Sequence, residues 1–310
     1  MSADAAAELD DGLLQSRLVD SGLFAAVHRV ASTGSTNEDL LSAADSAAAG
    51  AAMPHLTALT AEQQTGGRGR QARSWASPKG TSLSTSLLLR PSLPVVERHW
   101  VTLCVGLALV RALRSRGVPG ALKWPNDVHV RGRKIAGILA AVPLRDPEAV
   151  VVGCGINVLL DEQQLPTPTA TSLTLELARA GEPIPLPGTA AAGQLRSALL
   201  CDWLEEVAIL LEDVRHHGSI EPVRAEILAV ISTVGQDVRI ELPDGTAVRG
   251  AAVAVEHDGA LTVEVSGRRR AGSGAGGVAS EGLWRTERTP QRESFHAGDV
   301  VHLRPLGEPT

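Results

Sequence analysis

The pattern of apolar and polar positions predicts alternating helices and strands up to about residue 233. Several stretches place apolar residues at the three- to four-residue spacing of an amphipathic helix, and short apolar or alternating runs between them indicate strands. The predicted helices are residues 36–49, 95–116, 172–180, 190–216 and 221–231. The predicted strands are residues 56–60, 81–89, 122–124, 128–130, 135–142 and 150–156.

Beyond Thr233 the pattern changes to short alternating strands. Two Asp-Gly pairs, at 244–245 and 258–259, are typical of hairpin turns. This part of the chain therefore predicts a small all-β barrel. The stretch 267–294 is rich in Gly, Arg and Ser, and we expect it to form a mobile loop inserted into the barrel. The strands expected here are 237–241, 247–255, 260–265 and 299–303.

Length and composition are those of a globular chain with a mostly aliphatic core. The 310 residues allow one large or two modest domains, and 44% are hydrophobic whereas only 2% are aromatic. The net charge of −6, from 29 Lys+Arg and 35 Asp+Glu, argues against non-specific nucleic-acid binding. No apolar run is long enough to predict a membrane span, and the acidic start does not resemble a signal peptide.

The cysteines and histidines predict neither a disulfide nor a zinc site. Cys104, Cys154 and Cys201 lie far apart in apolar contexts, which favours buried free thiols in a reducing cytosol. His216 and His217 are adjacent at the end of a predicted helix, and no histidine pair has zinc-ligand spacing. We therefore expect a cytoplasmic protein without a metal site built by its own side chains.

One polar stretch, residues 62–75, has neither a helical nor a strand period and is predicted to be a loop. Three glycines and three arginines fall between residues 66 and 73. The glycines let the backbone approach a ligand, and the arginines offer forked donors for carboxylate and phosphate oxygens. Trp75 adds a flat face on which a base could stack. The stretch suits an anionic ligand with a ring. A solvated linker has the same composition, whereas a dinucleotide fingerprint is rejected because no helix follows.

Other short motifs place polar groups and glycines near predicted element ends. Ser35 and Glu38 form a capping box, so Ser35 has a simple role as a helix cap that is compatible with ligand binding. Gly153 and Gly155 interrupt a predicted buried strand, which indicates close approach of another backbone or a ligand. No Walker A motif and no Ser-His-Asp arrangement is evident. Many cations without a protein nucleophile suit attack of a carboxylate on a nucleotide phosphorus.

Five motifs, in order along the chain, resemble those of biotin–protein ligases. They are Gly-Ser-Thr-Asn at 34–37, Gln64 with Gly-Arg-Gly-Arg at 67–70, Lys-Trp-Pro-Asn-Asp at 123–127, Arg-Lys at 133–134 with Gly-Ile-Leu at 137–139, and Gly-Cys-Gly-Ile-Asn at 153–157. Residues 297–303 also look like the last strand of that family's C-terminal barrel. The resemblance covers roughly residues 28–305.

The resemblance implies an α+β fold. A class II synthetase-like catalytic domain would hold a central mixed or mostly antiparallel sheet with helices packed on one face, and a small SH3-like β-barrel would follow. The expected division is an N-terminal extension at 1–27, the catalytic domain at 28–233, and the barrel at 234–310 with its flexible insertion at about 267–294. The segment ahead of the first motif is too short for a DNA-binding domain, so the resemblance is to the monofunctional class.

The activity implied by the resemblance has two steps. Biotin and ATP with Mg²⁺ would give biotinyl-5′-adenylate, and the biotinyl group would then pass to a lysine of a biotin carboxyl carrier domain of an acyl-CoA carboxylase. Neither nucleic acid nor membrane is an expected partner. Two alternatives remain open. One is a lipoate–protein ligase, which shares the fold and the adenylation chemistry. The other is a regulatory module that senses biotin or its adenylate without turnover.

The resemblance also implies roles for individual residues. Lys134, which would neutralise the carboxylate and α-phosphate, and Arg70, which would retain the adenylate, are the expected catalytic residues. The expected biotin-binding residues are Ser35, Thr36, Asn37, Gln64, Arg68, Gly69, Arg70, Lys134 and Gly137. The expected nucleotide-binding residues are Arg70, Arg73, Trp75, Asn126, Asp127 and Asn157. The stretch containing the arginines is expected to order over the intermediate and exclude water.

Overall fold

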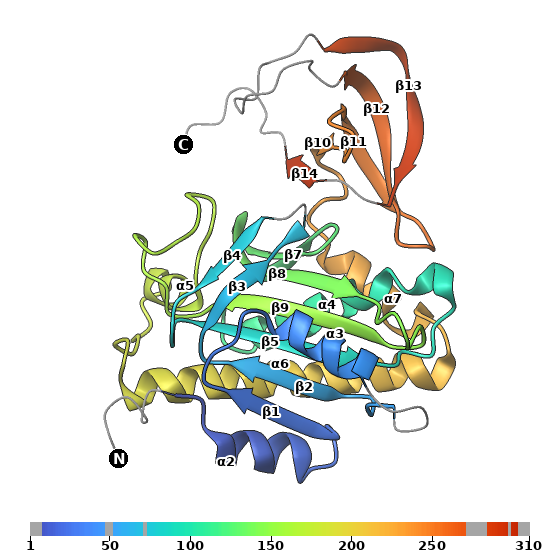
Figure 1. Cartoon of the computed structure of the whole chain (residues 1–310). Helices are drawn as coiled ribbons and strands as arrows, with labels where there is room; N and C mark the ends of the chain where they lie inside the picture. Colours follow the sequence, from blue (N-terminus) through green and yellow to red (C-terminus); the bar gives the residue numbers. More distant parts are fainter. Residues whose placement is uncertain (1–7, 47–51, 71–72, 271–283, 297–298, 303–310) are drawn as a thin grey trace.

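A seven-stranded mixed sheet forms the centre of the computed structural model, which describes residues 8–46, 52–70, 73–270, 284–296 and 299–302 (Figure 1). The strand order is β1-β2-β5-β9-β8-β7-β6. Only β1 and β2 pair in parallel, and the other neighbours are antiparallel. The strands are β1 (Ala26–Val30), β2 (Thr57–Ala61), β5 (Ser82–Leu89), β6 (Gly120–Lys123), β7 (Asp127–Val130), β8 (Arg133–Ala141) and β9 (Val150–Asn157). The predicted mixed, mostly antiparallel sheet is confirmed.

Helices cover both faces of this sheet. They are α2 (Asp11–Leu14), α3 (Thr36–Ser46), α4 (Trp100–Arg114), α5 (Leu173–Arg179), α6 (Ala190–His217) and α7 (Glu221–Val230). Alternate residues of a strand face opposite sides. Leu87 and Leu89 of β5 belong to the main core with α4 and α6, whereas Leu88 packs against Leu40 of α3. The prediction of helices on one face was therefore wrong for α3. Because every residue of β5 is buried, this strand needs cover on both sides.

The N-terminal segment packs into the same body. Leu9, Leu14, Leu18 and Phe24 are buried in the main core, and strand β1 begins at Ala26. The described part of residues 1–27 therefore packs against the main body, and the division at residue 27 stays a prediction. Strand β1 was not predicted, because all but one of its residues are half-buried and its sequence shows no clean alternation of apolar and polar positions.

The Arg/Gly-rich stretch forms a small hairpin rather than the predicted loop. Strands β3 (Gln64–Arg68) and β4 (Ser74–Ser77) pair as a two-stranded sheet. The N–H groups of Thr65 and Gly66 donate to the carbonyls of Thr33 and Gly34, which ties β3 to the start of α3. Most of β3 is solvent-facing, so hydrophobic periodicity gave no strand signal there. The turn residues 71–72 lie outside the described residues.

The C-terminal part is a five-stranded antiparallel sheet in the order β13-β12-β11-β10-β14. Its strands are β10 (Asp237–Glu241), β11 (Ala247–Val255), β12 (Leu261–Arg269), β13 (Arg285–Phe295) and β14 (Asp299–His302). Strands β13 and β14 lie at the two edges of this order, so the predicted barrel is not confirmed. The predicted loop at 267–294 was wrong for the residues that extend β12 and form β13. Their polar composition concealed the strands, and residues 271–283 lie outside the described residues.

Two indole groups attach the C-terminal sheet to the main body. Trp100 Nε1 donates to the carbonyl of His257 at 2.7 Å, and Trp124 Nε1 donates to that of Gly259 at 2.9 Å. Both carbonyls belong to the turn between β11 and β12. Trp124 also lies two residues before Asn126, so the same segment contacts both the C-terminal sheet and the cavity described below. The division of the chain at residue 233 stays a prediction.

Cys104, Cys154 and Cys201 are free and buried, as predicted. Burial raises the pKa of the Cys104 thiol to about 12 and that of Cys201 to about 11. None of the described helices is long and apolar enough to cross a membrane.

Candidate active site

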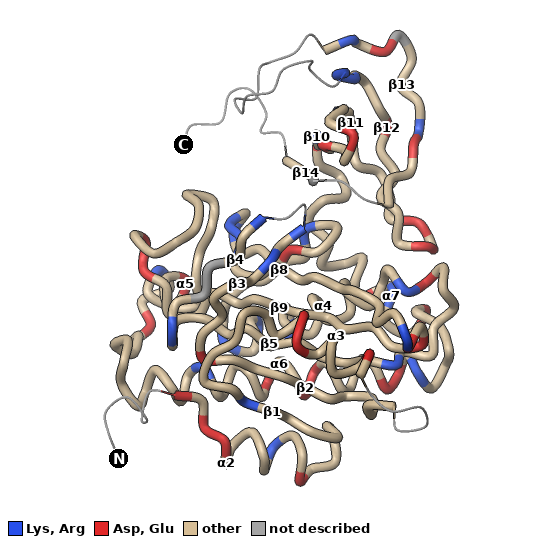
Figure 2. Tube along the Cα trace, in the orientation of Figure 1, with Lys and Arg blue, Asp and Glu red and all other residues tan. Residues whose placement is uncertain are grey.

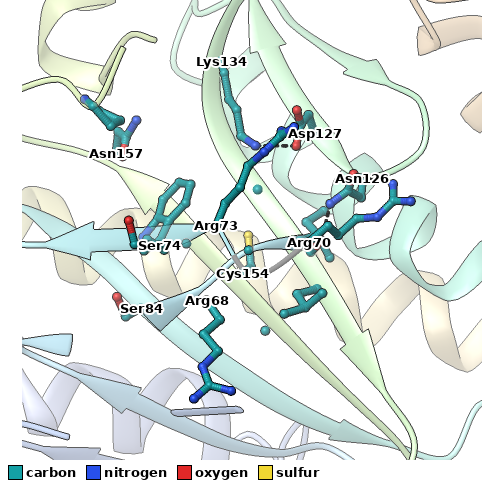
Figure 3. Close-up of a pocket in the computed structure, with 18 of the residues that line it drawn as sticks. Arg68, Arg70, Arg73, Ser74, Ser84, Asn126, Asp127, Lys134, Cys154 and Asn157 are labelled. Atoms are coloured by element: carbon teal, nitrogen blue, oxygen red, sulfur yellow. Dashed lines mark hydrogen bonds and ion pairs between the residues drawn. The ribbon is translucent and has the colours of Figure 1, made fainter. Parts of the chain in front are cut away.

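A cavity of about 350 Å³ lies on the α3 face of the central sheet (Figure 3). Every residue that the sequence assigned to a site lines this cavity. These residues are Ser35, Thr36, Asn37, Gln64, Arg68, Gly69, Arg70, Arg73, Trp75, Asn126, Asp127, Lys134, Gly137 and Asn157. They come from the start of α3, from the β3–β4 hairpin, and from strands β7, β8 and β9. The structure thus brings together motifs that are up to about 120 residues apart in the sequence.

The cavity floor exists because strands β5 and β9 change character along one face. Leu88 of β5 pairs with Val151 of β9, and both lie beneath α3. Further along the same face, Ser86 pairs with Gly153 and Ser84 pairs with Gly155. Large apolar side chains thus give way to small ones just past the helix. Space remains open above Ser84, Ser86 and the two glycines, all of which line the cavity.

One end of the cavity is formed by uncharged groups at the start of α3. The backbone N–H and the hydroxyl of Thr36 contact Gln64 Oε1 at 3.0 and 3.2 Å, and Ser86 Oγ donates to Thr36 Oγ1 at 2.7 Å. Asn37 Nδ2 donates to the Leu139 carbonyl at 3.0 Å. Asn37 Oδ1 is buried and has no hydrogen-bond partner among the residues that the structure describes. A buried acceptor of this kind is costly unless a ligand donor satisfies it.

Glycines make room for the side chains of this cavity. A Cβ added at Gly153 would lie 2.5 Å from Asn37 Oδ1, and one added at Gly155 would overlap the indole of Trp75. A Cβ at Gly67 would overlap the amide of Gln64. The sequence indicated close approach of a backbone or a ligand to the glycines of the 150–156 strand. The groups that approach Gly153 and Gly155 are instead this chain's own site side chains.

The other end of the cavity is charged and is centred on Lys134 and Asp127 (Figure 3). Lys134 Nζ lies 2.6 Å from Asp127 Oδ1 and 5.8 Å from the centre of the Trp75 ring. His129 Nε2 is 3.8 Å from Asp127 Oδ2, too long for a hydrogen bond. Burial alone would raise the pKa of Asp127, but His129 and Lys134 outweigh it and hold that pKa below its usual value. Asp127 is therefore a carboxylate at neutral pH.

The arginines of the hairpin surround this charged end. Arg70 Nη1 donates to Asn126 Oδ1 at 3.3 Å, and Asn126 Nδ2 donates in turn to the Ile138 carbonyl at 2.7 Å. Arg73 extends toward Lys134 and Asp127, whereas Arg68 extends the opposite way (Figure 3). Arg68 is 3.3 Å from Glu38 Oε1 on α3. Figure 2 shows Lys and Arg positions gathered where β3, β4 and β8 meet.

Charge is unevenly distributed among the lining residues. Five cations line the cavity, namely Arg68, Arg70, Arg73, Lys123 and Lys134. Asp127 is the one carboxylate among the lining residues that the structure describes. This arrangement favours a ligand that carries several negative charges. The uncharged end suits a compact ligand with both hydrogen-bond donors and acceptors.

Several lining residues were absent from the sequence-based site. Ser84 and Ser86 could have been found from strand alternation opposite Gly153 and Gly155. His129 and Lys123 flank the Asp127 turn and could have been added by proximity. The segment 166–170 also lines the cavity, and its polar Pro/Thr composition carried no signal. It lies beside the cavity because its backbone bonds to Lys134 of β8.

Comparisons with known proteins agree with this geometry. The model of the biotin/lipoate A/B protein ligase family matches residues 33–157. A biotin--[acetyl-CoA-carboxylase] ligase of Mycobacterium tuberculosis is 36% identical over 302 residues, which cover 96% of each chain. The bifunctional ligase/repressor BirA of Bacillus subtilis is 30% identical over 216 residues, which cover 69% of this chain and 63% of that protein.

A solved structure gives the same fold. A biotin protein ligase from Aquifex aeolicus in complex with biotin and ATP has a TM-score of 0.64, with 24% identity over 91% of this chain and 100% of that chain. The match to the Mycobacterium tuberculosis ligase extends over nearly the whole of both chains, and the family model spans the motifs at both ends of the cavity. The chain therefore belongs to the biotin protein ligase family.

Proposed function

We propose that this protein activates biotin as biotinyl-5′-adenylate with ATP and transfers it to a lysine of a biotin carboxyl carrier domain. The observation that carries the proposal is a single cavity with two chemically different ends, one uncharged and one cationic, the cationic end being centred on Lys134 beside Trp75. Such a cavity accommodates a neutral ring system whose carboxylate reaches toward a nucleotide phosphate. The relative named biotin--[acetyl-CoA-carboxylase] ligase supports the same assignment.

The uncharged end binds the ureido ring of biotin. A ureido group has two N–H donors and one carbonyl acceptor, so one N–H satisfies the unpaired Asn37 Oδ1. Ser35, Thr36 and Gln64 supply the remaining polar contacts. The Thr36–Gln64–Ser86 bonds hold these groups in place before biotin binds, which lowers the entropy lost on binding.

Adenylation takes place at the charged end. A carboxylate oxygen of biotin attacks the α-phosphorus of ATP, the bond to the β-phosphate oxygen breaks, and pyrophosphate leaves with the bonding electrons. Lys134 lies where the charges of carboxylate and phosphate meet and neutralises both in the transition state. Trp75 covers the adenylate, and Asn157 and Arg73 contact its nucleotide part. The backbone of Arg68, Gly69 and Gly137 adjoins the biotin carboxylate.

Transfer uses the same site. The amine of the acceptor lysine attacks the acyl carbon of the mixed anhydride, AMP leaves, and the amine proton is lost to solvent. Arg70, held by Asn126 at 3.3 Å, keeps the adenylate bound until the acceptor arrives. A fixed guanidinium there lowers the loss of a reactive intermediate and limits its hydrolysis.

Mg²⁺ bound together with the phosphates of ATP would supply charge neutralisation for the departing pyrophosphate. Among the residues that the structure describes, no group of three or more His, Cys, Asp or Glu side chains could hold a metal ion by itself. Asp127 and Asn126 are the oxygen ligands at hand, and few protein ligands plus substrate phosphates are what Mg²⁺ prefers. The residues therefore fit a cation that is shared with ATP.

The acceptor, the compartment and the domain division belong to the same proposal. A biotin carboxyl carrier domain of an acyl-CoA carboxylase is the protein partner, and the buried free thiols suit a reducing cytoplasm. The net charge of −6 disfavours nucleic acid as a partner. Residues 28–233 form the catalytic domain, and residues 234–310 form the C-terminal one that docks through the turn bound by Trp100 and Trp124.

The decisive experiment is acid-dependent ATP–pyrophosphate exchange with Mg²⁺, run in parallel with biotin and with lipoate. We expect exchange with biotin alone. Exchange with lipoate alone would retain the mechanism but assign the uncharged end to a different acid. No exchange with either acid, from protein shown to be folded, would leave a binding module and contradict the proposed activity.

A further inference from the structure

Thr171 links two site residues that lie at different parts of the charged end. Its backbone N–H donates to the Lys134 carbonyl at 2.8 Å, and its own carbonyl accepts from Asn157 Nδ2 at 3.0 Å. Lys134 N–H donates to the Thr169 carbonyl at 2.8 Å, so the segment 169–171 runs beside strand β8 like a short extra strand. Thr171 therefore connects the backbone of Lys134 to the side chain of Asn157, in addition to the pairing of β8 with β9.

Thr171 is in turn held by a buried carboxylate outside the cavity. Thr171 Oγ1 donates to Glu176 Oε1 at 2.6 Å, and both side chains are almost inaccessible, at 0% and 1% exposure. Arg179 Nη1 contacts the same Glu176 oxygen at 2.5 Å and Thr171 Oγ1 at 3.1 Å. Arg131 Nη1 contacts the second oxygen, Glu176 Oε2, at 2.7 Å. Both carboxylate oxygens of Glu176 thus accept hydrogen bonds, one from Thr171 and Arg179 and the other from Arg131.

These contacts join the two elements that flank Lys134. Arg131 lies at the turn between β7 and β8, three residues before Lys134, and it has a left-handed φ of 48°. A non-glycine residue in that region is strained and persists only where other contacts hold it. Glu176 holds the turn through Arg131 and holds the neighbouring segment through Thr171. Lys134 lies between these two attachments.

We propose that Glu176 is a positioning residue for the nucleotide half of the site, acting through Thr171 on Lys134 and Asn157 and through Arg131 on the β7–β8 turn. The three residues that contact the Glu176 side chain, Thr171, Arg179 and Arg131, all lie outside the motifs by which the sequence resembles its family. The inference rests on the proposed function, because it assigns the nucleotide to the end that holds Lys134 and Asn157.

The uncharged, biotin-binding end of the cavity is held by a separate set of bonds. Its groups are held by the bonds of Thr36 with Gln64 and Ser86, and by the bond of Asn37 to the Leu139 carbonyl. They come from α3, β3, β5 and β8 rather than from the segment 169–171. Loss of the Glu176 contacts therefore weakens nucleotide binding and leaves biotin binding nearly unchanged.

The test measures the dissociation constants of biotin and of α,β-methylene-ATP separately by calorimetry, since this analogue has no cleavable bond between its α- and β-phosphates. Glu176→Gln removes the charge with little change of shape, and Thr171→Val removes the hydroxyl. We expect each variant to weaken the analogue about tenfold, equivalent to about 1.4 kcal/mol, and to change biotin binding less than twofold. Thr171→Ser retains the hydroxyl and is expected to bind the analogue within twofold of the parent.

Glu97→Gln is the matched control, because Glu97 is also buried, at 5% exposure, and accepts from the Ile220 N–H away from the cavity. It is expected to leave both dissociation constants unchanged. Equal weakening of both ligands, an unchanged analogue, or the same pattern in Glu97→Gln would overturn the positioning role. If the parent protein bound neither biotin nor the analogue, the proposed function would fail. Parent protein that binds both ligands, with variants that do not show the expected difference, would overturn only the positioning role of Glu176.

Discussion

The two ends of the cavity are built from different kinds of side chain, and the difference concerns how far each is prepared for its ligand. At the biotin end, Ser35 and Thr36 are buried, at 5% and 3% exposure, and Thr36 already bonds Gln64 and Ser86. At the nucleotide end, Lys134 and Asp127 are 35% and 21% exposed and neutralise each other across 2.6 Å. The first end already has most of its hydrogen bonds without its ligand and leaves only Asn37 Oδ1 for a ligand donor, whereas the second holds its cation against an internal anion.

This contrast follows from the cost of keeping charges together. Neutral hydroxyl and amide groups can bond one another in a buried site at little cost. Five neighbouring cations repel one another, and Asp127 offsets part of that repulsion. An arriving phosphate then competes with Asp127 for Lys134. We infer that binding at the biotin end depends on shape and hydrogen bonds, and that binding at the nucleotide end depends on charge.

The largest effect is expected from Lys134→Ala. The charged end would lose the cation at the point where carboxylate and phosphate meet, and single-turnover formation of the adenylate should fall at least about a hundredfold. Biotin affinity should fall by a smaller factor, because the ureido end keeps its bonds and only the biotin carboxylate loses a neighbouring cation. Rapid-quench measurement of adenylate and calorimetric titration of biotin separate the two quantities.

Arg133→Ala is the control for that variant, since Arg133 is the exposed neighbouring cation on the same strand. It removes the same charge from β8 without opening the cavity. Normal adenylation in Lys134→Ala would remove Lys134 from the mechanism. An equal reduction in both variants would show that general positive charge matters rather than the position of Lys134.

A smaller and more selective effect is expected from two glycines of β9. In Gly155→Ala the new methyl group displaces the Trp75 indole, so adenylate should dissociate about tenfold faster. In Gly153→Ala the methyl group displaces Asn37 Oδ1, so biotin affinity should fall by about the same factor. The two positions lie two residues apart on one face of one strand. Stopped-flow measurement of adenylate dissociation and calorimetric titration of biotin quantify the two effects. Equal effects of both variants on both ligands would contradict the division of the cavity into two ends.

The membership of the site was predictable from sequence because its residues belong to short contiguous motifs. The residues were chosen because these motifs resemble those of a known family, and all of them line one cavity. The same residues misled the prediction of local structure. Gln64–Arg68 forms a strand that pairs with β4 and also bonds to the carbonyls of Thr33 and Gly34, and such distant partners leave no period in the sequence.

Other features lay beyond sequence reasoning because they depend on contacts between distant segments. Strand β1 is stabilised by parallel pairing with β2, and its half-buried residues show no alternation. The role of Thr171 depends on backbone bonds to residue 134 and on a buried carboxylate five residues ahead. The small residues of the cavity floor are informative only once β5 and β9 are known to pair in register.

The smallest expected effect is on stability, and its dependence on pH should differ between the two ends of the cavity. Asp127→Asn breaks the ion pair with Lys134 and should lower the free energy of unfolding by about 1 kcal/mol at pH 7. The pKa of Asp127 is lowered below 3.8 in the folded protein, so its contribution is present above that pH and is lost as the pH falls through the lower folded value. The difference between parent and variant should therefore be equal at pH 7 and pH 5 and shrink only below about pH 3.8.

Ser86→Ala supplies the comparison at the biotin end, where it removes the hydrogen bond to Thr36 Oγ1. Its loss of about 1 kcal/mol should be the same at every pH, since no titrating group takes part. Asp213→Asn, at an exposed position of α6, controls for the change of net charge. Urea unfolding at pH 7, 5 and 3 measures all three differences. A pH-independent loss in Asp127→Asn would mean that Asp127 acts by hydrogen bonding alone, and the electrostatic contrast between the two ends would fail.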